Sequence, residues 1–295
     1  KNISMKIIDG KKISNDVLDE IKNHVEDRVK NRKKVPHLAA VLVGDDGPSQ
    51  TYVSSKIRAC ERVGFNSSLF KFQDKITENE LLNEITKINE NKEIDGFIVQ
   101  LPLPPHIDQE KILTQVSPDK DVDGFHPLNY GRMTLGIDTF LPATPAGIIE
   151  LIKRYKIDLS GKRCLVIGRS QIVGRPISIL LSQNKPHANA TVTLAHSRSK
   201  DLDLLCKNSD IIITAIGIPE FLKSSMVSDN TKIIDVGISR IDDDSNSKGY
   251  KIVGDVDFED FNQRDVMITP VPGGVGPMTI AMLLSNTLKA CKLND

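Results

Sequence analysis

The sequence predicts an α/β protein made of two α/β domains that flank a cleft. Two series of apolar strands and amphipathic helices follow each other along the chain, and a loop-like stretch past Asp119 separates them. The length of 295 residues suits two domains that each bury a core. We place the first domain at residues 1–143, completed by a C-terminal helix at 277–295, and the second domain at residues 144–276.

The first series follows from hydrophobic periodicity. Apolar residues recur at three- and four-residue intervals from Ile13 to Val29, which predicts an amphipathic helix. Thr77 and Glu80 have the spacing of a capping box. The elements expected in order are a helix at 13–29, a strand at 38–44, a helix at about 49–64, a strand at 65–72, a helix at 77–91 and a strand at 94–101. Such alternation predicts parallel strands with right-handed crossovers.

The second series begins after a loop-like stretch at residues 119–133. Pro145 suits the first turn of a helix at 144–155. The further elements expected are strands at 163–168, 190–196, 210–217, 231–238 and 266–271, and helices at 174–183, 202–208 and 277–291. The last helix is apolar enough to pack back across the first domain, and residues 242–249 indicate a solvated hairpin or loop.

Composition excludes several classes of protein. The 39 basic residues balance the 39 acidic ones, so no overall field favours nucleic acid or an acidic membrane surface. The four cysteines form no CxxC pair and the six histidines no HxxxH pair, so neither a metal site nor a disulfide framework is predicted. No apolar stretch approaches the roughly 20 residues that span a bilayer. We expect a cytoplasmic enzyme or binding protein.

The segment GRSQIVGRP places a glycine turn between a buried strand and a helix. Backbone N–H groups at such a turn bind phosphate, so the segment is a candidate dinucleotide site. Its candidate residues are Gly168, Arg169, Ser170 and Gly174. The pattern departs from the strict GxGxxG fingerprint, and a plain turn between strand and helix remains the alternative.

The end of the following strand, AHSRSK, indicates which dinucleotide binds. An acidic residue there would bind a ribose 2′-hydroxyl and repel a 2′-phosphate. Ser197 and Arg198 instead offer hydrogen-bond donors and positive charge, which favours NADP over NAD. The alternative is that Arg198 is an ordinary surface arginine.

In YVSSKIRAC, Tyr52 and Lys56 are four residues apart and share one face of a helix. A flat substrate can stack on the ring while the lysine transfers protons. Gln100 ends a buried strand in VQLPLPP, where ligands of open α/β sheets bind, and can hydrogen-bond the lysine. A solvated lysine on an amphipathic helix and a capped strand end are the alternatives.

Two further motifs are rich in turn residues. In DKDVDGFHP, Asp121 and Asp123 precede a glycine, and one carboxylate can accept paired hydrogen bonds from an amino-pyrimidine type of ring. Turn-forming aspartate is the alternative. TPVPGGVGPMT, residues 269–279, is a rigid stretch in which backbone can approach a ligand closely, although a linker is also compatible.

Together, YVSSKIRAC, VQLPLPP, DVDGFHP, GRSQIVGRP and TPVPGGVGPMT, in this order over essentially the whole chain, resemble the bifunctional methylenetetrahydrofolate dehydrogenase/cyclohydrolase family. The resemblance implies an N-terminal catalytic domain that binds tetrahydrofolate one-carbon derivatives and a C-terminal, Rossmann-like NADP-binding domain. It also implies a homodimer joined through the cofactor domains. The expected activity is oxidation of methylenetetrahydrofolate with NADP, followed by hydrolysis of methenyltetrahydrofolate to formyltetrahydrofolate.

The resemblance also assigns roles in the first domain. Lys56 is the expected acid and base of the hydrolytic step, and Tyr52 positions the substrate. Gln100 orients Lys56 and helps to keep it partly neutral, and Asp123 holds the pterin ring. Leu101 completes the expected substrate contacts.

In the second domain the glycine turn is expected to hold the cofactor phosphates, and Ser197 with Arg198 to face the 2′-phosphate. Ile238 is expected to lie by the nicotinamide. The expected floor between cofactor and folate is formed by Pro272, Gly273 and Gly274. The hydride passes directly between the two rings, so the protein mainly supplies proximity and orientation.

Other interpretations are a dehydrogenase without the hydrolase, an NAD-dependent member, and a non-catalytic folate or nucleotide sensor on the same fold. The first-domain motifs keep the bifunctional pattern, which argues against the first. The segment SRSK argues against the second. Intact Tyr52, Lys56 and Gln100 argue against a sensor, which has no need of an acid and base lysine.

Overall fold

The computed structural model of the chain describes residues 5–245 and 249–295. The chain forms two compact units. Of the described residues, the three-stranded unit comprises Asn15–Ala143 and Ile280–Asp295, and the six-stranded unit comprises those up to Ser14 and those of Thr144–Thr279. Each unit has a parallel sheet with helices, which confirms the predicted fold class.

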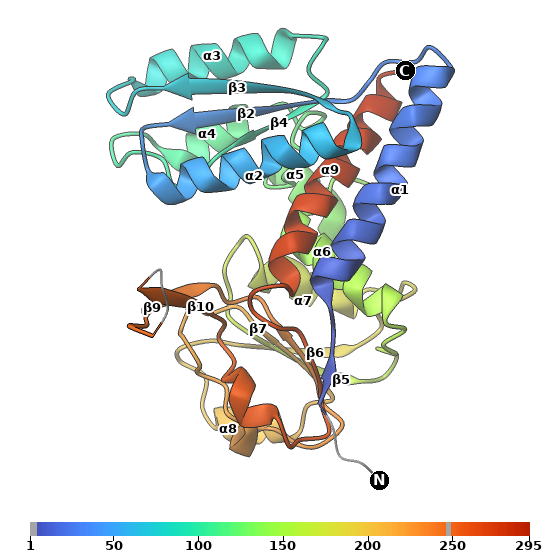
Figure 1. Cartoon of the computed structure of the whole chain (residues 1–295), viewed down its shortest axis with the longest axis vertical. Coiled ribbons are helices and arrows are strands. Elements are labelled where there is room, and N and C mark those ends of the chain that lie inside the picture. Colours follow the sequence, from blue (N-terminus) through green and yellow to red (C-terminus); the bar gives the residue numbers. More distant parts are fainter. Residues whose placement is uncertain (1–4, 246–248) are drawn as a thin grey trace. The chain divides into compact units, whose positions relative to one another are not determined.

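The three-stranded unit has β2 in the centre of its sheet, between β3 and β4, with both pairs parallel. Its elements are α1 (Gly10–Lys30), β2 (His37–Val43), α2 (Gly47–Val63), β3 (Asn66–Phe72), α3 (Glu78–Glu90), β4 (Gly96–Val99), α4 (Gln109–Gln115), α5 (Pro127–Thr134) and α9 (Val275–Leu293). Figure 1 shows α2 and α3 on opposite sides of the strands. Thr77 and Glu80 form the predicted capping box at the start of α3, which confirms that prediction.

The strands β2 and β4 are buried on both faces, which explains why each is an almost uninterrupted apolar run. Leu81 and Ile85 from α3 and Ile112 from α4 pack in one core cluster with Val41 and Phe97 from the strands. The helices α3 and α4 therefore cover one face of the sheet.

The six-stranded unit has the strand order β1-β11-β8-β7-β5-β6, and all neighbouring strands are parallel. Its elements are β1 (Lys6–Ile7), α6 (Ala143–Arg154), β5 (Arg163–Ile167), α7 (Gly174–Ser182), β6 (Thr191–Ala195), α8 (Leu202–Lys207), β7 (Ile211–Thr214), β8 (Lys232–Asp235), β9 (Ser239–Asp242), β10 (Tyr250–Val253) and β11 (Met267–Ile268), with short 3₁₀ helices at Ser224–Met226 and Phe258–Phe261. Because β5 to β8 are parallel, the turns that follow them lie at one edge of the sheet.

Three parts of the structure differ from the sequence-based expectation. The prediction of a loop at residues 119–133 is wrong for its second half, because the helix α5 begins at Pro127 with His126 as its N-cap. The helix α4 was not predicted. The strand β1 pairs with β11, so residues 5–14 lie in the six-stranded unit, whereas the sequence placed them in the first domain at 1–143.

Residues 242–249 carry a prediction of a solvated hairpin or loop. The strands β9 and β10 flank this segment and pair in antiparallel register, with Tyr250 opposite Asp242. Residues 246–248 lie outside the described residues. The flanking strands agree with the hairpin alternative.

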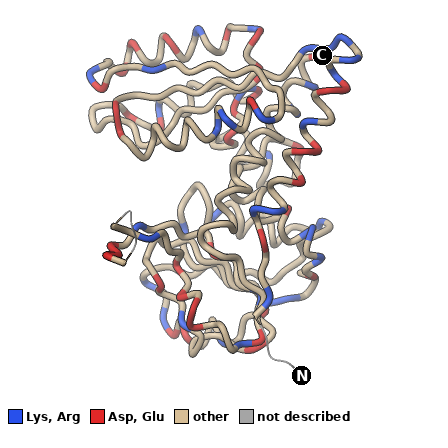
Figure 2. The backbone as a smooth tube through the Cα atoms, in the orientation of Figure 1, with Lys and Arg blue, Asp and Glu red and all other residues tan. Residues whose placement is uncertain are grey.

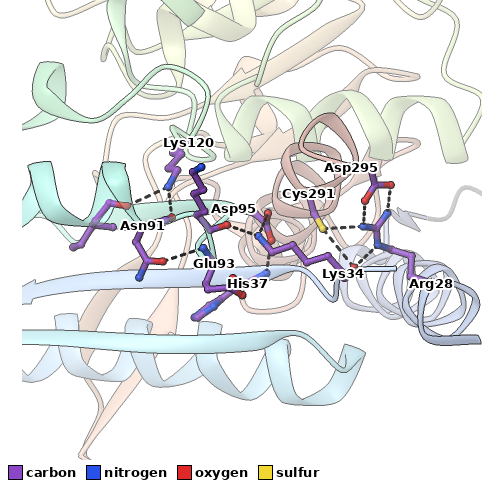
Figure 3. Close-up of polar contacts among 11 residues, drawn as sticks. Arg28, Lys34, His37, Asn91, Glu93, Asp95, Lys120, Cys291 and Asp295 are labelled. Carbon is purple, nitrogen blue, oxygen red and sulfur yellow. Dashed lines mark hydrogen bonds and ion pairs between the residues drawn. The ribbon is translucent and has the colours of Figure 1, made fainter. Parts of the chain in front are cut away.

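A polar network anchors the end of α9 in the three-stranded unit (Figure 3). Asp95, which is fully buried, accepts hydrogen bonds from Lys34 Nζ (2.8 Å) and from the backbone N–H of His37 (2.9 Å). Arg28 donates to Cys291 Sγ at 3.1 Å and pairs with Asp295. Segments far apart in sequence are thus held by charged groups that each have a partner of opposite charge.

Charges of both signs are interspersed along the tube in each unit (Figure 2). Within the two described ranges, none of the helices is long and apolar enough to cross a membrane.

Candidate active site

The predicted acid and base residues meet at the carboxyl end of β4. Tyr52 and Lys56 lie one turn apart on α2, and Gln100 directly follows β4. Lys56 Nζ donates to Gln100 Oε1 at 3.2 Å. Gln100 Nε2 donates to the carbonyl of Leu101 at 2.8 Å, which turns the amide oxygen toward the lysine. The structure therefore brings these residues together, and the ring of Tyr52 is half exposed.

Asp121 is the structural aspartate of its motif. Its buried carboxylate accepts hydrogen bonds from the backbone N–H groups of Phe125 (3.1 Å) and His126 (2.8 Å) and from Asn129 Nδ2 (2.9 Å). Burial raises its pKa to about 6. Asp121 thus holds the turn that leads into α5.

Asp123, the second aspartate of the motif, lies close to Lys56. Burial raises its pKa, and the positive charge of Lys56 opposes that rise. Among the described residues, no hydrogen bond to its carboxylate is formed, whereas Asp121 accepts three. The two alternatives for this motif therefore apply to different residues: Asp121 forms the turn, and Asp123 lies near the lysine.

The glycine turn of the six-stranded unit joins β5 to α7. Gly168 has φ +117°, and a Cβ there would lie 2.2 Å from the carbonyl oxygen of Ala215. A Cβ on Gly174 would lie 1.9 Å from the carbonyl oxygen of Gly168. Ser170 Oγ accepts from the backbone N–H groups of Val173 (3.2 Å) and Gly174 (3.3 Å). This close packing suits backbone contacts with a phosphate at the start of α7.

The residues expected near a 2′-phosphate form a tight turn after β6. His196 N donates to Ser199 Oγ at 2.9 Å, and Arg198 N donates to His196 Nδ1 at 3.2 Å. The side chains of Ser197 and Arg198 are exposed, as is that of Arg169. In the described part of the chain, no acidic side chain pairs with either arginine, so both are available to an anion.

Ile238 and the proline-glycine segment line one cavity of about 160 Å³ within the six-stranded unit. Pro272, Gly273 and Gly274 form one part of its wall, and Ile252 from β10 contributes another. The sequence predicted Ile238 and the segment separately. The structure brings them together.

Sequence reasoning missed two buried carboxylates, one of which lines this cavity. Asp235 ends β8 and lines the cavity, and Asp255 follows β10; their exposed fractions are 2% and 0%. The glycines in DVG and GDVD leave room for them: a Cβ on Gly254 would lie 1.9 Å from Asp235 Oδ2, and one on Gly237 would lie 2.3 Å from Asp255 Oδ1. A glycine directly before Asp255 and another two residues after Asp235 were the only local indications.

No group of three or more His, Cys, Asp or Glu residues in the described ranges is arranged to hold a metal ion. The arrangement offers a lysine with a glutamine partner in one unit, and a glycine turn and a mostly apolar cavity in the other.

Known families match both units. Residues 8–123 match the model described as the catalytic domain of tetrahydrofolate dehydrogenase/cyclohydrolase, and residues 142–295 match the NAD(P)-binding domain of the same family. A protein named bifunctional protein FolD from Flavobacterium johnsoniae is 58% identical over 291 residues, which is 99% of each chain.

Two solved structures are also similar. The bifunctional FolD enzyme of Campylobacter jejuni has a TM-score of 0.92 and 46% identity, and the match covers 98% of this chain and 99% of that one. The FolD of Trypanosoma brucei, described as complexed with NADP cofactor and inhibitor, has a TM-score of 0.92 and 34% identity, with 98% of each chain covered.

Proposed function

The chain belongs to the tetrahydrofolate dehydrogenase/cyclohydrolase family, and from that premise we propose that it carries out both reactions of the family. It oxidises methylenetetrahydrofolate to methenyltetrahydrofolate with NADP and hydrolyses the product to formyltetrahydrofolate, within one-carbon metabolism. The family predicted from the five motifs is confirmed by the two domain models.

The observation that carries the hydrolytic half is the hydrogen bond from Lys56 Nζ to Gln100 Oε1. The amide oxygen fixes the direction of the ammonium group. Asp123 lies close enough for the positive charge of Lys56 to oppose the rise that burial causes in its pKa. A lysine held in this way can take a proton from water as it attacks and later return a proton to a ring nitrogen of the substrate. In this proposal Tyr52 stacks on the substrate, Leu101 contacts it, and the acceptor oxygens of Asp123 hold the pterin.

The glycine turn fits a dinucleotide. Gly168 and Gly174 admit no Cβ, and Ser170 Oγ organises the first N–H groups of α7, so Arg169 and these residues bind the phosphates. When bound, NADP supplies the hydride acceptor of the first reaction. Ile238 lies by the nicotinamide, and the segment from Pro272 through Gly274 forms the floor of that pocket.

NADP is preferred over NAD because Ser197 and Arg198 face the 2′-phosphate. Both side chains are exposed at the end of β6, where a residue that binds a ribose 2′-hydroxyl would be acidic. The guanidinium of Arg198 can form two charge-assisted hydrogen bonds to a phosphate.

The hydrolytic assignment is tested with Lys56→Met. We expect methenyltetrahydrofolate hydrolysis to fall by about 10²- to 10⁴-fold, the usual contribution of a general acid and base, with unchanged NADP affinity. Arg58→Met, on the same helix but exposed, is the matched control and retains activity. Full hydrolysis by Lys56→Met would remove the assigned role.

The cofactor assignment is tested by following reduced cofactor and methenyl intermediate separately by absorbance. Wild type reduces NADP with little build-up of the intermediate. Arg198→Ala loses roughly 10- to 100-fold in NADP affinity and little with NAD, because only NADP carries the charge-assisted contact. Lys162→Ala, exposed before β5 in the same unit, is the control. Reduction of neither dinucleotide despite folate binding would favour the sensor interpretation.

A homodimer joined through the cofactor domains and a cytoplasmic location complete the proposal. The four cysteines, all buried free thiols, suit a reducing compartment. Light scattering of the purified chain tests the dimer, and a monomer at micromolar concentration would contradict it.

A further inference from the structure

Two buried carboxylates lie at the carboxyl edge of the six-stranded sheet. Asp235 Oδ1 accepts hydrogen bonds from Thr214 Oγ1 (3.2 Å) and from the backbone N–H groups of Gly237 (2.9 Å) and Asp255 (3.0 Å). Its other oxygen, Oδ2, accepts from the N–H of Val256 at 2.9 Å. Every one of these donors is neutral.

Asp255 is held in the same way. Its Oδ2 accepts from the N–H of Ile216 at 2.7 Å, and its Oδ1 accepts from the N–H of Ile218 at 3.0 Å. Among the residues that the structure describes, no lysine, arginine or histidine pairs with Asp235 or Asp255. The pair therefore places negative charge in the interior without a cation to balance it.

Buried charges in proteins ordinarily have a partner of opposite charge, because desolvation is otherwise too costly. Asp235 borders a cavity whose other walls are mostly apolar: Ile238, Ile252, Val271 and Pro272. Flat apolar walls beside a negative charge suit a planar organic cation. The oxidised nicotinamide ring is such a cation, and the ring becomes neutral when it accepts a hydride.

We propose that Asp235, supported by Asp255, makes this cavity select the oxidised form of the nicotinamide over the reduced form. This inference rests on the proposed function, since it takes the ring by Ile238 to be nicotinamide. The aspartates are positioning and selectivity residues. They bind the charged cofactor before hydride transfer and favour release of the neutral one after it.

The charge of Asp235 is pH-dependent. Burial raises the pKa of Asp235 to about 6, and burial also raises that of Asp255. The groups that face Asp235 are the hydroxyl of Thr214 on β7, the N–H of Gly237, the N–H groups of the segment after β10, and Asp255, whose negative charge adds to the rise. Below about pH 6 Asp235 is protonated, and the preference for the oxidised ring is expected to fall.

The test is calorimetric binding of NADP⁺ and of NADPH to the full chain, with the ratio of the two affinities as the readout. Both forms carry the same phosphates, so phosphate titration cancels in the ratio. We expect Asp235→Asn to lower NADP⁺ affinity roughly tenfold relative to NADPH, because one buried charge is removed. Asparagine keeps an acceptor oxygen at the Oδ1 position.

The control is Asp210→Asn, which removes the same charge immediately before β7, at the opposite end of that strand from Thr214. It leaves the ratio unchanged. The wild-type chain supplies a second measurement that does not depend on the folding of a variant: the ratio declines as pH falls from 7.5 to 5.5, with a midpoint near 6.

A ratio that is independent of pH in wild type, with both forms bound and the substrate turned over, overturns this inference and leaves the proposed function intact. A ratio that changes equally in Asp210→Asn overturns it as well. Failure of the wild-type chain to bind either form overturns the proposed function itself, and the inference with it.

Discussion

Asp95 in the three-stranded unit and Asp235 in the six-stranded unit are both buried aspartates beside a strand, and they differ in how their charge is balanced. Asp95 accepts from the ammonium of Lys34 at 2.8 Å (Figure 3). Within residues 5–245 and 249–295, Asp235 accepts only from a hydroxyl and backbone N–H groups. The first carboxylate is neutralised within the fold. The second keeps its charge for something that enters the cavity.

This difference teaches that burial alone does not assign a role. Asp121 shows the intermediate case, because it also accepts from neutral donors, but those donors build the turn that leads into α5. A ligand role is indicated where an unbalanced buried charge and a cavity coincide, as they do at Asp235.

The comparison is tested most strongly by Asp95→Ala. The substitution leaves the partly buried ammonium of Lys34 without its carboxylate and the N–H of His37 without an acceptor. We expect the free energy of unfolding to fall by about 3 kcal/mol, as when one partner of a buried pair is removed. Urea unfolding followed by circular dichroism measures it.

The control for that variant is Lys33→Ala, at the residue before Lys34. It breaks an exposed ion pair between Lys33 and Asp295. Exposed pairs contribute little, so no clear change is expected. Equal effects of Asp95→Ala and Lys33→Ala would mean that the buried pair does not hold the network.

The second variant acts on the six-stranded unit. In Gly254→Ala the new Cβ would lie 1.9 Å from Asp235 Oδ2 and 2.8 Å from Val271 Cγ2, so the carboxylate must move. We expect a loss of about 2 kcal/mol in the free energy of unfolding, typical of overpacking, together with weaker NADP⁺ binding.

Gly131→Ala in α5 is the matched control, since a Cβ there meets nothing within 4 Å. It is expected to stabilise the chain by about 0.5 to 1 kcal/mol, because glycine is unfavourable inside a helix. Unaltered NADP⁺ binding in Gly254→Ala would argue that the position of the Asp235 carboxylate does not matter.

The sequence predicted long periodic elements well, and it missed elements defined by distant partners. The capping box of Thr77 and Glu80 is local and was recognised. Two residues of β1 carry no periodicity, and only pairing with β11 makes them a strand. The helix α5 lies in the stretch that the sequence predicts as a loop, although Pro127 in its first turn is itself a helix-start indication.

The candidate site also contains residues that the sequence predicts and features that only the folded structure shows. Lys56 and Gln100 are 44 residues apart, yet strand and helix patterns placed each at a position from which they meet. The choice between Asp121 and Asp123 depends on which carboxylate receives backbone N–H groups, and sequence does not encode that directly. Asp235 lies within the strand expected at residues 231–238, but its partners come from the end of β7 and the segment after β10, which the sequence pattern does not bring together.

The variant with the smallest expected effect, Thr214→Val, tests most directly whether Asp235 carries the charge that the cofactor meets. Thr214→Val removes one neutral donor from Asp235 Oδ1 and preserves side-chain shape. A hydrogen bond to a carboxylate favours its charged form, so losing that bond raises the pKa of Asp235 further above its usual value. The pH at which the NADP⁺ preference declines must therefore move upward, with a stability cost of about 1 kcal/mol. Binding ratios measured across the pH range test this, and a downward move would show that Asp235 is not the titrating group.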